Sequence, residues 1–172
     1  MSNDLQSSAN IQTYLSFRLD EEVFAITVFK VLNILEMRPI TKVPQSPEYM
    51  KGVINLRGNV LPVIDLRVKF GMPAIEQTVD TCIIVLNLNM GGDTVLLGIQ
   101  VDAVKEVLEL REDQIEPSPS IGTKYNNTFI QGMFRVNENF IMILNIDKVF
   151  ASEDIVSVKE SAEGQQVSEV KE

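Results

Sequence analysis

The pair Arg57-Gly58 is the first candidate for chemistry, because it interrupts the apolar segment KGVINLRGNVLPVIDLRVKF of residues 51–70. One interpretation is a hairpin loop of Arg57, Gly58 and Asn59, in which Gly58 supplies a positive φ and Arg57 is merely exposed. The other is recognition, since a planar guanidinium suits a carboxylate or carbonyl oxygens of a partner. Residue chemistry alone leaves the two interpretations evenly matched.

The sequence offers little for catalysis. It contains no histidine, the most common general base and catalytic metal ligand. The single cysteine, Cys82, lies in the apolar run TCIIVLN without a neighbouring cation, so we expect a buried structural thiol. Asp65 is expected to cap the turn that opens LRVKFG or to pair with Arg67, because a lone carboxylate makes a poor active site. We expect no catalytic residues, no metal and no cofactor.

Composition favours a folded protein with protein or small-molecule partners. The chain has 172 residues and 45% hydrophobic content, which is ample for a packed core. Its net charge of -9 argues against nucleic acid or an anionic membrane surface as the main partner, because both would repel it. With one cysteine, no signal sequence and no apolar run of roughly 20 residues, the sequence predicts a cytoplasmic protein without membrane insertion.

Short strands dominate the predicted elements, and each is bounded by turn formers. Helical signals are fewer: Ser46-Pro47 is typical of a helix start, and the segment from Asn145 suits a terminal helix. We expect residues 1–12 to be a disordered tail and residues 151–172 to form a C-terminal helix and a flexible tail. The predicted strands are 13–19, 22–28, 52–56, 59–66, 81–88, 94–101 and 139–146.

The sequence also contains an internal repeat. Residues 24–37 match residues 96–110, and residues 51–70 match residues 131–150, with seven additional residues between the matched segments of the second copy. Two copies of about five short strands predict two small β-barrels, because a flat sheet of such strands would leave unpaired edges. A cleft between the barrels is the expected place for binding. Among the matched pairs are Val28 with Val101, Val31 with Val104, Ile34 with Val107 and Gly52 with Gly132.

One family resemblance covers nearly the whole folded chain, from about Tyr14 to Phe150. The segment MKGVINLRGNVLPVIDLRVKFG, with FAITVFKVLNIL before it and LLGIQVDAVKEVLEL after it, closely resembles the CheW chemotaxis coupling proteins. The turn Asn-Leu-Arg-Gly followed by Pro-x-x-Asp-Leu-Arg is quite specific to this domain, which also occurs at the carboxy terminus of the CheA kinase. The resemblance implies a mainly β domain over residues 13–150, built from two interlocked, pseudo-symmetric five-stranded Src-homology-3-like barrels, roughly 13–80 and 81–150, with short helices.

The same resemblance implies a non-catalytic, cytoplasmic adaptor. Such proteins join the cytoplasmic tips of chemoreceptors, the methyl-accepting chemotaxis proteins, to the regulatory domain of the histidine kinase CheA. They are recruited to membrane receptor arrays, where they also contact other CheA or coupler domains. An alternative is a coupler of the same fold in another sensory pathway, such as surface motility or second-messenger control. A small-molecule binding barrel or an enzyme is disfavoured by the missing histidine and phosphate-binding loop.

Residue by residue, the family motifs point to a binding groove between the barrels. Arg57 is the arginine of Asn-Leu-Arg-Gly, and Gly52 is the glycine that opens its strand. Val31 matches the valine of the family segment Lys-Val-x-Glu-Ile. The valines of this set belong either to the groove wall or to the core. The predicted receptor- and kinase-binding residues are Val28, Val31, Asn33, Gly52, Arg57, Gly58, Val101 and Val104.

Asn33 is a departure from the family pattern. It stands where the family commonly has a glutamate that pairs with the motif arginine. Arg57 is therefore expected to lack that internal partner. It could bond to Asn33 instead, be free for a carboxylate of the receptor, or pair with another acidic residue.

Overall fold

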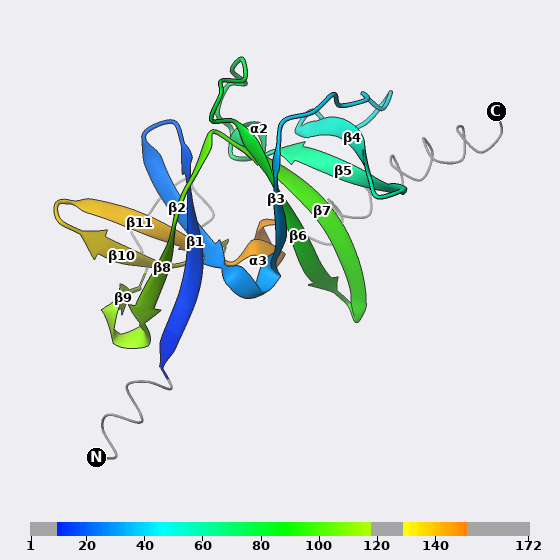
Figure 1. Cartoon of the computed structure of the whole chain (residues 1–172). Helices are drawn as coiled ribbons and strands as arrows, with labels where there is room; N and C mark the ends of the chain where they lie inside the picture. Colours follow the sequence, from blue (N-terminus) through cyan, green and yellow to red (C-terminus); the bar gives the residue numbers. More distant parts are fainter. Residues whose placement is uncertain (1–9, 118–128, 151–172) are drawn as a thin grey trace.

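The protein is mainly β, in agreement with the sequence prediction. In the computed structural model, which describes residues 10–117 and 129–150, the strands form two sheets curled as half-barrels (Figure 1). The strands are β1 (Ile11–Leu19), β2 (Glu22–Thr27), β3 (Val31–Glu36), β4 (Met50–Leu56), β5 (Asn59–Asp65), β6 (Cys82–Met90), β7 (Asp93–Val101), β8 (Ala103–Arg111), β9 (Ile115–Glu116), β10 (Ile130–Val136) and β11 (Asn139–Leu144). The helices of the described residues are short: the 3-10 turns η1 (Val28–Lys30) and η2 (Glu112–Gln114), and the α-helices α2 (Leu66–Lys69) and α3 (Ile146–Val149).

The two sheets exchange strands between the two halves of the sequence. Sheet A has six strands in the order β8-β1-β2-β11-β10-β9, and sheet B has five in the order β3-β6-β7-β5-β4. These orders coincide when β3, β6, β7, β5 and β4 are matched with β8, β1, β2, β11 and β10, which agrees with the internal repeat. An isolated bridge of Thr41 with Val53 occupies the place in sheet B that β9 occupies in sheet A.

Each sheet contains strands from both halves of the sequence, so the two half-barrels are interlocked. Strands β1 and β2 of the first half lie in sheet A, where β2 pairs in parallel with β11. The chain passes from sheet A to sheet B through η1, and returns to sheet A at Asp102, between β7 and β8. The predicted subdomain boundary near residue 80 stays a prediction. The division of the chain between the two sheets is a separate matter and falls at η1 and at Asp102.

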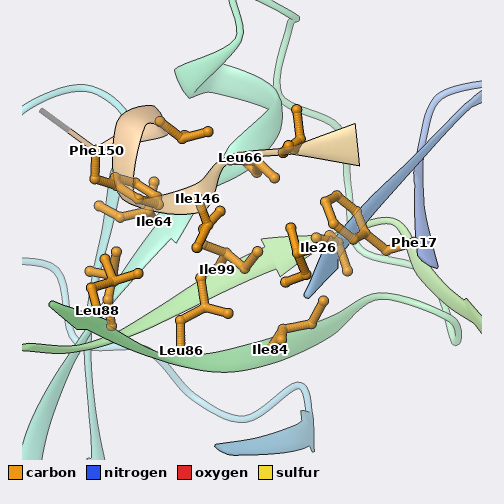
Figure 2. Packing of buried hydrophobic residues seen from close by; sticks show 14 of the residues in the cluster. Phe17, Ile26, Ile64, Leu66, Ile84, Leu86, Leu88, Ile99, Ile146 and Phe150 are labelled. Carbon is orange, nitrogen blue, oxygen red and sulfur yellow. The ribbon is translucent and has the colours of Figure 1, made fainter. Parts of the chain in front are cut away.

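The largest of three apolar clusters among the described residues takes side chains from both sheets, whereas the other two lie within sheet B and within sheet A. Figure 2 shows Ile26 of sheet A and Ile146 of α3 near Ile99 of sheet B, with Phe17 at one side of the cluster and Phe150 at the other, near Ile64. Complete burial of a side chain of this size contributes about 1.5–3 kcal/mol to stability. The sheets therefore stabilise each other through the largest cluster, which they share.

Several local predictions differ from the structure. Strands β3, β8, β9 and β10 were not among the predicted strands, because their apolar residues do not alternate cleanly in the sequence. The predicted helix start at Ser46-Pro47 is wrong: Met50 donates its N–H to the carbonyl oxygen of Pro47 in a turn and then begins β4. Ile11 and Gln12, which the predicted tail of residues 1–12 included, pair with β8, and residues 1–9 of that prediction lie outside the described residues.

The short helices α2 and α3 begin at matched positions of the repeat. The Asp65 carboxylate accepts hydrogen bonds from the backbone N–H groups of Arg67 and Val68, and the Asn145 side chain accepts one from Lys148. Asp65 is therefore the predicted cap, whereas the Arg67 guanidinium pairs with other acids. The predicted terminal helix starts at Asn145 as expected, and its predicted continuation over 151–172 lies outside the described residues.

Candidate functional site

Arg57 and Gly58 form a two-residue turn between β4 and β5, with Asn59 already in the second strand. Both turn residues have positive φ, 53° for Arg57 and 84° for Gly58, as in a type I′ hairpin. The Gly58 N–H donates to Asn55 Oδ1 over 2.8 Å, which supports the turn. Glycine adopts this backbone freely, but a left-handed conformation costs most other residues about 1–2 kcal/mol.

The Arg57 side chain is displayed rather than bound internally. It is exposed, and no hydrogen bond or ion pair joins it to another of the described residues. Asparagine or glycine would suit its backbone conformation better than arginine does. An unfavourable backbone angle at an exposed arginine that has no partner in residues 10–117 and 129–150 favours the recognition interpretation over the ordinary turn.

Asn33 does not take over the role of an internal partner for Arg57. It is half-buried in β3, and its Oδ1 accepts a hydrogen bond from the backbone N–H of Ile34 over 3.0 Å. The predicted hydrogen bond between Asn33 and Arg57 is absent within the described part of the chain, and no described acid replaces it. Three outcomes were predicted for Arg57: a bond to Asn33, a bond to another acid, or a guanidinium free for a carboxylate of a partner. Its surroundings among the described residues support the third.

The four valines of the predicted set lie at the two crossovers between the sheets. Val28 begins η1 and Val31 directly follows it, whereas Val101 precedes Asp102 and Val104 lies two residues after it. Val28, Val31 and Val104 are half-buried and pack against the shared core, so each keeps an exposed part. Val101 is only 1% exposed, so it is a core residue that packs beneath the crossover and offers no surface to a partner.

Gly52 acts through the backbone. It is buried, its φ is 148°, and a Cβ atom built on it would lie 2.2 Å from the carbonyl oxygen of Thr41. Only glycine therefore allows Thr41 to exchange backbone hydrogen bonds with Val53 beside it. Gly52 holds the base of the Arg57 hairpin against the rest of sheet B and offers no side chain to a partner.

An exposed apolar strip beside Val28 and Val31 was not foreseen. Phe29 in η1 is 80% exposed, and Leu32 and Ile34 of β3 are 55% and 44% exposed. Exposed apolar side chains close together in a chain are candidates for protein association, because exposed apolar patches mark such sites. The sequence signal was Phe29 within TVFKVL. The three-residue spacing of the neighbouring valines drew attention to those valines as a groove wall, and it did not show which side chains point into solvent.

A buried charged cluster was also missed. The Arg67 side chain is 3% exposed, and its Nη1 lies 2.6 Å from Asp20 Oδ1 and 2.6 Å from Asp102 Oδ2. Its Nε donates to the carbonyl oxygen of Pro73. Burial lowers the pKa of Arg67, but the contacts with Asp20 and Asp102 outweigh burial and leave that pKa raised. The signal was the Asp-Leu-Arg motif, from which Asp65 was predicted either to cap the turn or to pair with Arg67.

Cys82 is half-buried, and its neighbourhood disfavours the thiolate. Burial and, to a lesser extent, the charge of Asp80 raise the pKa of the thiol, against a lowering by a backbone hydrogen bond with Val104. Across residues 10–117 and 129–150, no group of three or more histidine, cysteine or acidic side chains is arranged to hold a metal ion. The same part of the chain has no helix long and apolar enough to cross a membrane.

Known proteins share this sequence pattern and this fold. The family model described as CheW-like domain matches residues 13–154. The "Chemotaxis protein CheW" of Klebsiella aerogenes is 34% identical over 147 residues, which cover 86% of each chain. The protein of the same name from Rhizobium meliloti is 34% identical over 140 residues, covering 81% of this chain and 88% of the relative.

A solved structure is similar as well. The crystal structure of scaffolding protein TtCheW from Thermoanaerobacter tengcongensis superposes with a TM-score of 0.71 at 33% sequence identity. The match covers 83% of this chain and 94% of that one.

Proposed function

The chain belongs to the CheW-like domain family, and from this premise we propose that it is a non-catalytic adaptor that couples chemoreceptor tips to the histidine kinase CheA. It works in the cytoplasm and joins receptor arrays at the membrane through these partners. Its contribution is to hold receptor and kinase together in one orientation, which raises the effective concentration of each for the other. No bond is made or broken by the adaptor itself.

The observation that carries this proposal is Arg57 at the hairpin tip, exposed and held at a positive φ of 53° without a partner among the described residues. A receptor tip with a surface carboxylate would satisfy the guanidinium through a charge-assisted hydrogen bond. The apolar strip of Phe29, Leu32 and Ile34 adds the buried area that a stable protein contact needs. Arginine and aromatic residues are also the types that most often dominate binding energy.

Two substitutions test this assignment without touching the core. Arg57→Ala and Phe29→Ser each remove an exposed side chain, so the fold should be retained. We expect each to weaken binding to a receptor cytoplasmic fragment about tenfold, because a central contact contributes about 1.4 kcal/mol or more. Binding is measured by isothermal titration calorimetry, and kinase stimulation is measured with CheA added. Val31→Glu is a poorer choice, because it would place a charge against the shared core.

Matched controls come from the rest of the chain. Asn137→Ala changes the corresponding residue of the other hairpin, and Val79→Ser removes a fully exposed apolar side chain from the segment between α2 and β6. Both should bind like the unmodified chain. If Arg57→Ala and Phe29→Ser also bind like the unmodified chain, the proposed surface is wrong.

A further inference from the structure

Both crossovers between the sheets are tied by ion pairs to a short helix of the opposite half. Asp102 at the β7–β8 crossover pairs with Arg67 of α2, and Lys30 in the η1 crossover pairs with Asp147 of α3 over 3.0 Å. Arg67 and Asp147 occupy matched positions of the internal repeat. The arrangement is therefore repeated with the signs of the charges reversed.

The cluster of Arg67, Asp20 and Asp102, called here the Arg67 cluster, connects the two sheets at one end. Arg67 follows β5 of sheet B, whereas Asp20 lies in the turn between β1 and β2 of sheet A. Asp102 Oδ2 also accepts the backbone N–H of Asp20 over 2.7 Å, and the Asp102 N–H donates to the carbonyl oxygen of Arg18. One guanidinium thus fixes a turn of sheet A against a helix of sheet B.

The predicted binding valines are attached directly to these tied crossovers. Val101 and Val104 lie on either side of Asp102, Val28 begins η1, which ends at Lys30, and Val31 directly follows it. Exposed Phe29 is the neighbour of Lys30. A change in the angle between the sheets would move both crossovers, and with them the side chains offered to a partner.

We propose that Arg67, bound to Asp20 and Asp102, sets the angle between the two sheets and is thereby a positioning residue for partner binding. The Lys30–Asp147 pair performs the same task more weakly at the other crossover, because its side chains are 25% and 36% exposed and water screens it. Arg67 and Asp102 are 3% and 8% exposed, so their pairing is screened far less. The part about binding rests on the proposed function, whereas the part about sheet geometry does not.

The sheet geometry is tested by a distance measurement in the full chain without any partner. Spin labels are placed at Glu138→Cys, in the turn between β10 and β11 of sheet A, and at Glu36→Cys, the last residue of β3 in sheet B, both exposed positions, in a Cys82→Ser background. Double electron–electron resonance then gives the distribution of distances between the sheets. We expect Asp102→Asn and Arg67→Met to broaden or shift this distribution, and Arg67→Lys to fall between them and the unmodified chain.

Binding is measured with the same substitutions in the unlabelled chain, at a temperature where circular dichroism shows the variant to be folded. We expect Asp102→Asn to weaken binding of the receptor fragment at least fivefold, although neither Asp102 nor Arg67 reaches the exposed strip. Should Arg67→Met not fold, Asp102→Asn decides alone, because it leaves Arg67 paired with Asp20. Lys30→Asp should weaken binding about twofold, and adding Asp147→Lys should restore it.

Arg135→Gln is the control, because it removes an exposed ion pair with Glu116 inside sheet A. It should change neither the distance nor the binding. A folded Asp102→Asn variant with the original distance distribution would overturn the proposal, and so would a broadened distribution with unchanged binding. An unmodified chain that fails to bind receptor would count against the proposed function, while the distance measurement would still decide whether the Arg67 cluster sets the sheet angle.

Discussion

The two hairpins that the repeat relates, β4–β5 and β10–β11, share a backbone plan but differ at the tip. Each has a register shift that ends at a buried glycine, Gly52 in one and Gly132 in the other. At the turn, Arg57 has a φ of 53° and Asn137 a φ of 56°. Asparagine tolerates the left-handed region, and arginine does so at greater cost.

The difference separates what folding requires from what binding requires. The second hairpin carries the residue type that its backbone favours, so folding alone explains it. The first carries a residue type that its backbone disfavours, and that residue displays a charge without a partner among the described residues. The β4–β5 hairpin, whose turn residue suits its backbone less well, is thus the better candidate for contact with a partner. Three pairs of substitutions test this comparison.

The largest effect is expected at the two hairpin glycines. A Cβ on Gly52 would lie 2.2 Å from a backbone oxygen of Thr41, which cannot move without breaking the bridge to Val53. A Cβ on Gly132 would lie 2.5 Å from Cγ2 of Ile115 and 3.0 Å from the carbonyl oxygen of Glu116, so its closest contact is a side chain and not the backbone. We expect Gly52→Ala to lower the free energy of unfolding by about 3 kcal/mol and Gly132→Ala by about 1–2 kcal/mol. Urea unfolding curves measure both, and equal losses would contradict the distinction.

An intermediate effect is expected at the two helix caps. Asp65 is buried and accepts two backbone N–H groups, with distances of 3.0 and 3.5 Å, whereas Asn145 accepts one over 3.3 Å. Asp65→Ala should cost about 2 kcal/mol and Asn145→Ala about 0.5–1 kcal/mol, the upper and lower ranges for lost caps. Thermal unfolding by calorimetry gives the order. A larger loss for Asn145→Ala would contradict the prediction that burial and the second hydrogen bond make Asp65 the stronger cap.

The smallest change in stability, but the most informative one, is expected at the turn residues themselves. Arg57→Asn should raise the free energy of unfolding by up to about 1 kcal/mol, because asparagine suits the left-handed backbone better. The same variant should lose receptor binding. The reverse change, Asn137→Arg, should lower stability by a similar amount and leave binding unaltered. If Arg57→Asn is both less stable and fully able to bind, the contrast between the hairpins has no functional meaning.

Local sequence information was sufficient for much of the fold. Alternating apolar residues bounded by turn formers gave the mainly β class and seven of the strands, because side chains alternate between the faces of a sheet. The repeat revealed two similar units. Gly58 was recognised as a turn residue and Asp65 as a cap, since both functions depend on neighbours within three residues along the chain.

Other features depend on residues distant in the sequence and needed the tertiary structure. The repeat could not show that β1 and β2 would join β11 in sheet A. A strand has the same local sequence pattern whether it pairs with strands of its own half or with strands of the other half. Arg67 is separated from Asp20 by 47 positions and from Asp102 by 35, so nothing local identified its partners. The sequence by itself determined which residues form strands, turns and caps, through short-range backbone preferences. Only the tertiary structure decided which valines face the core, which apolar residues face solvent, and which charges hold the two sheets together, since those depend on packing between the sheets.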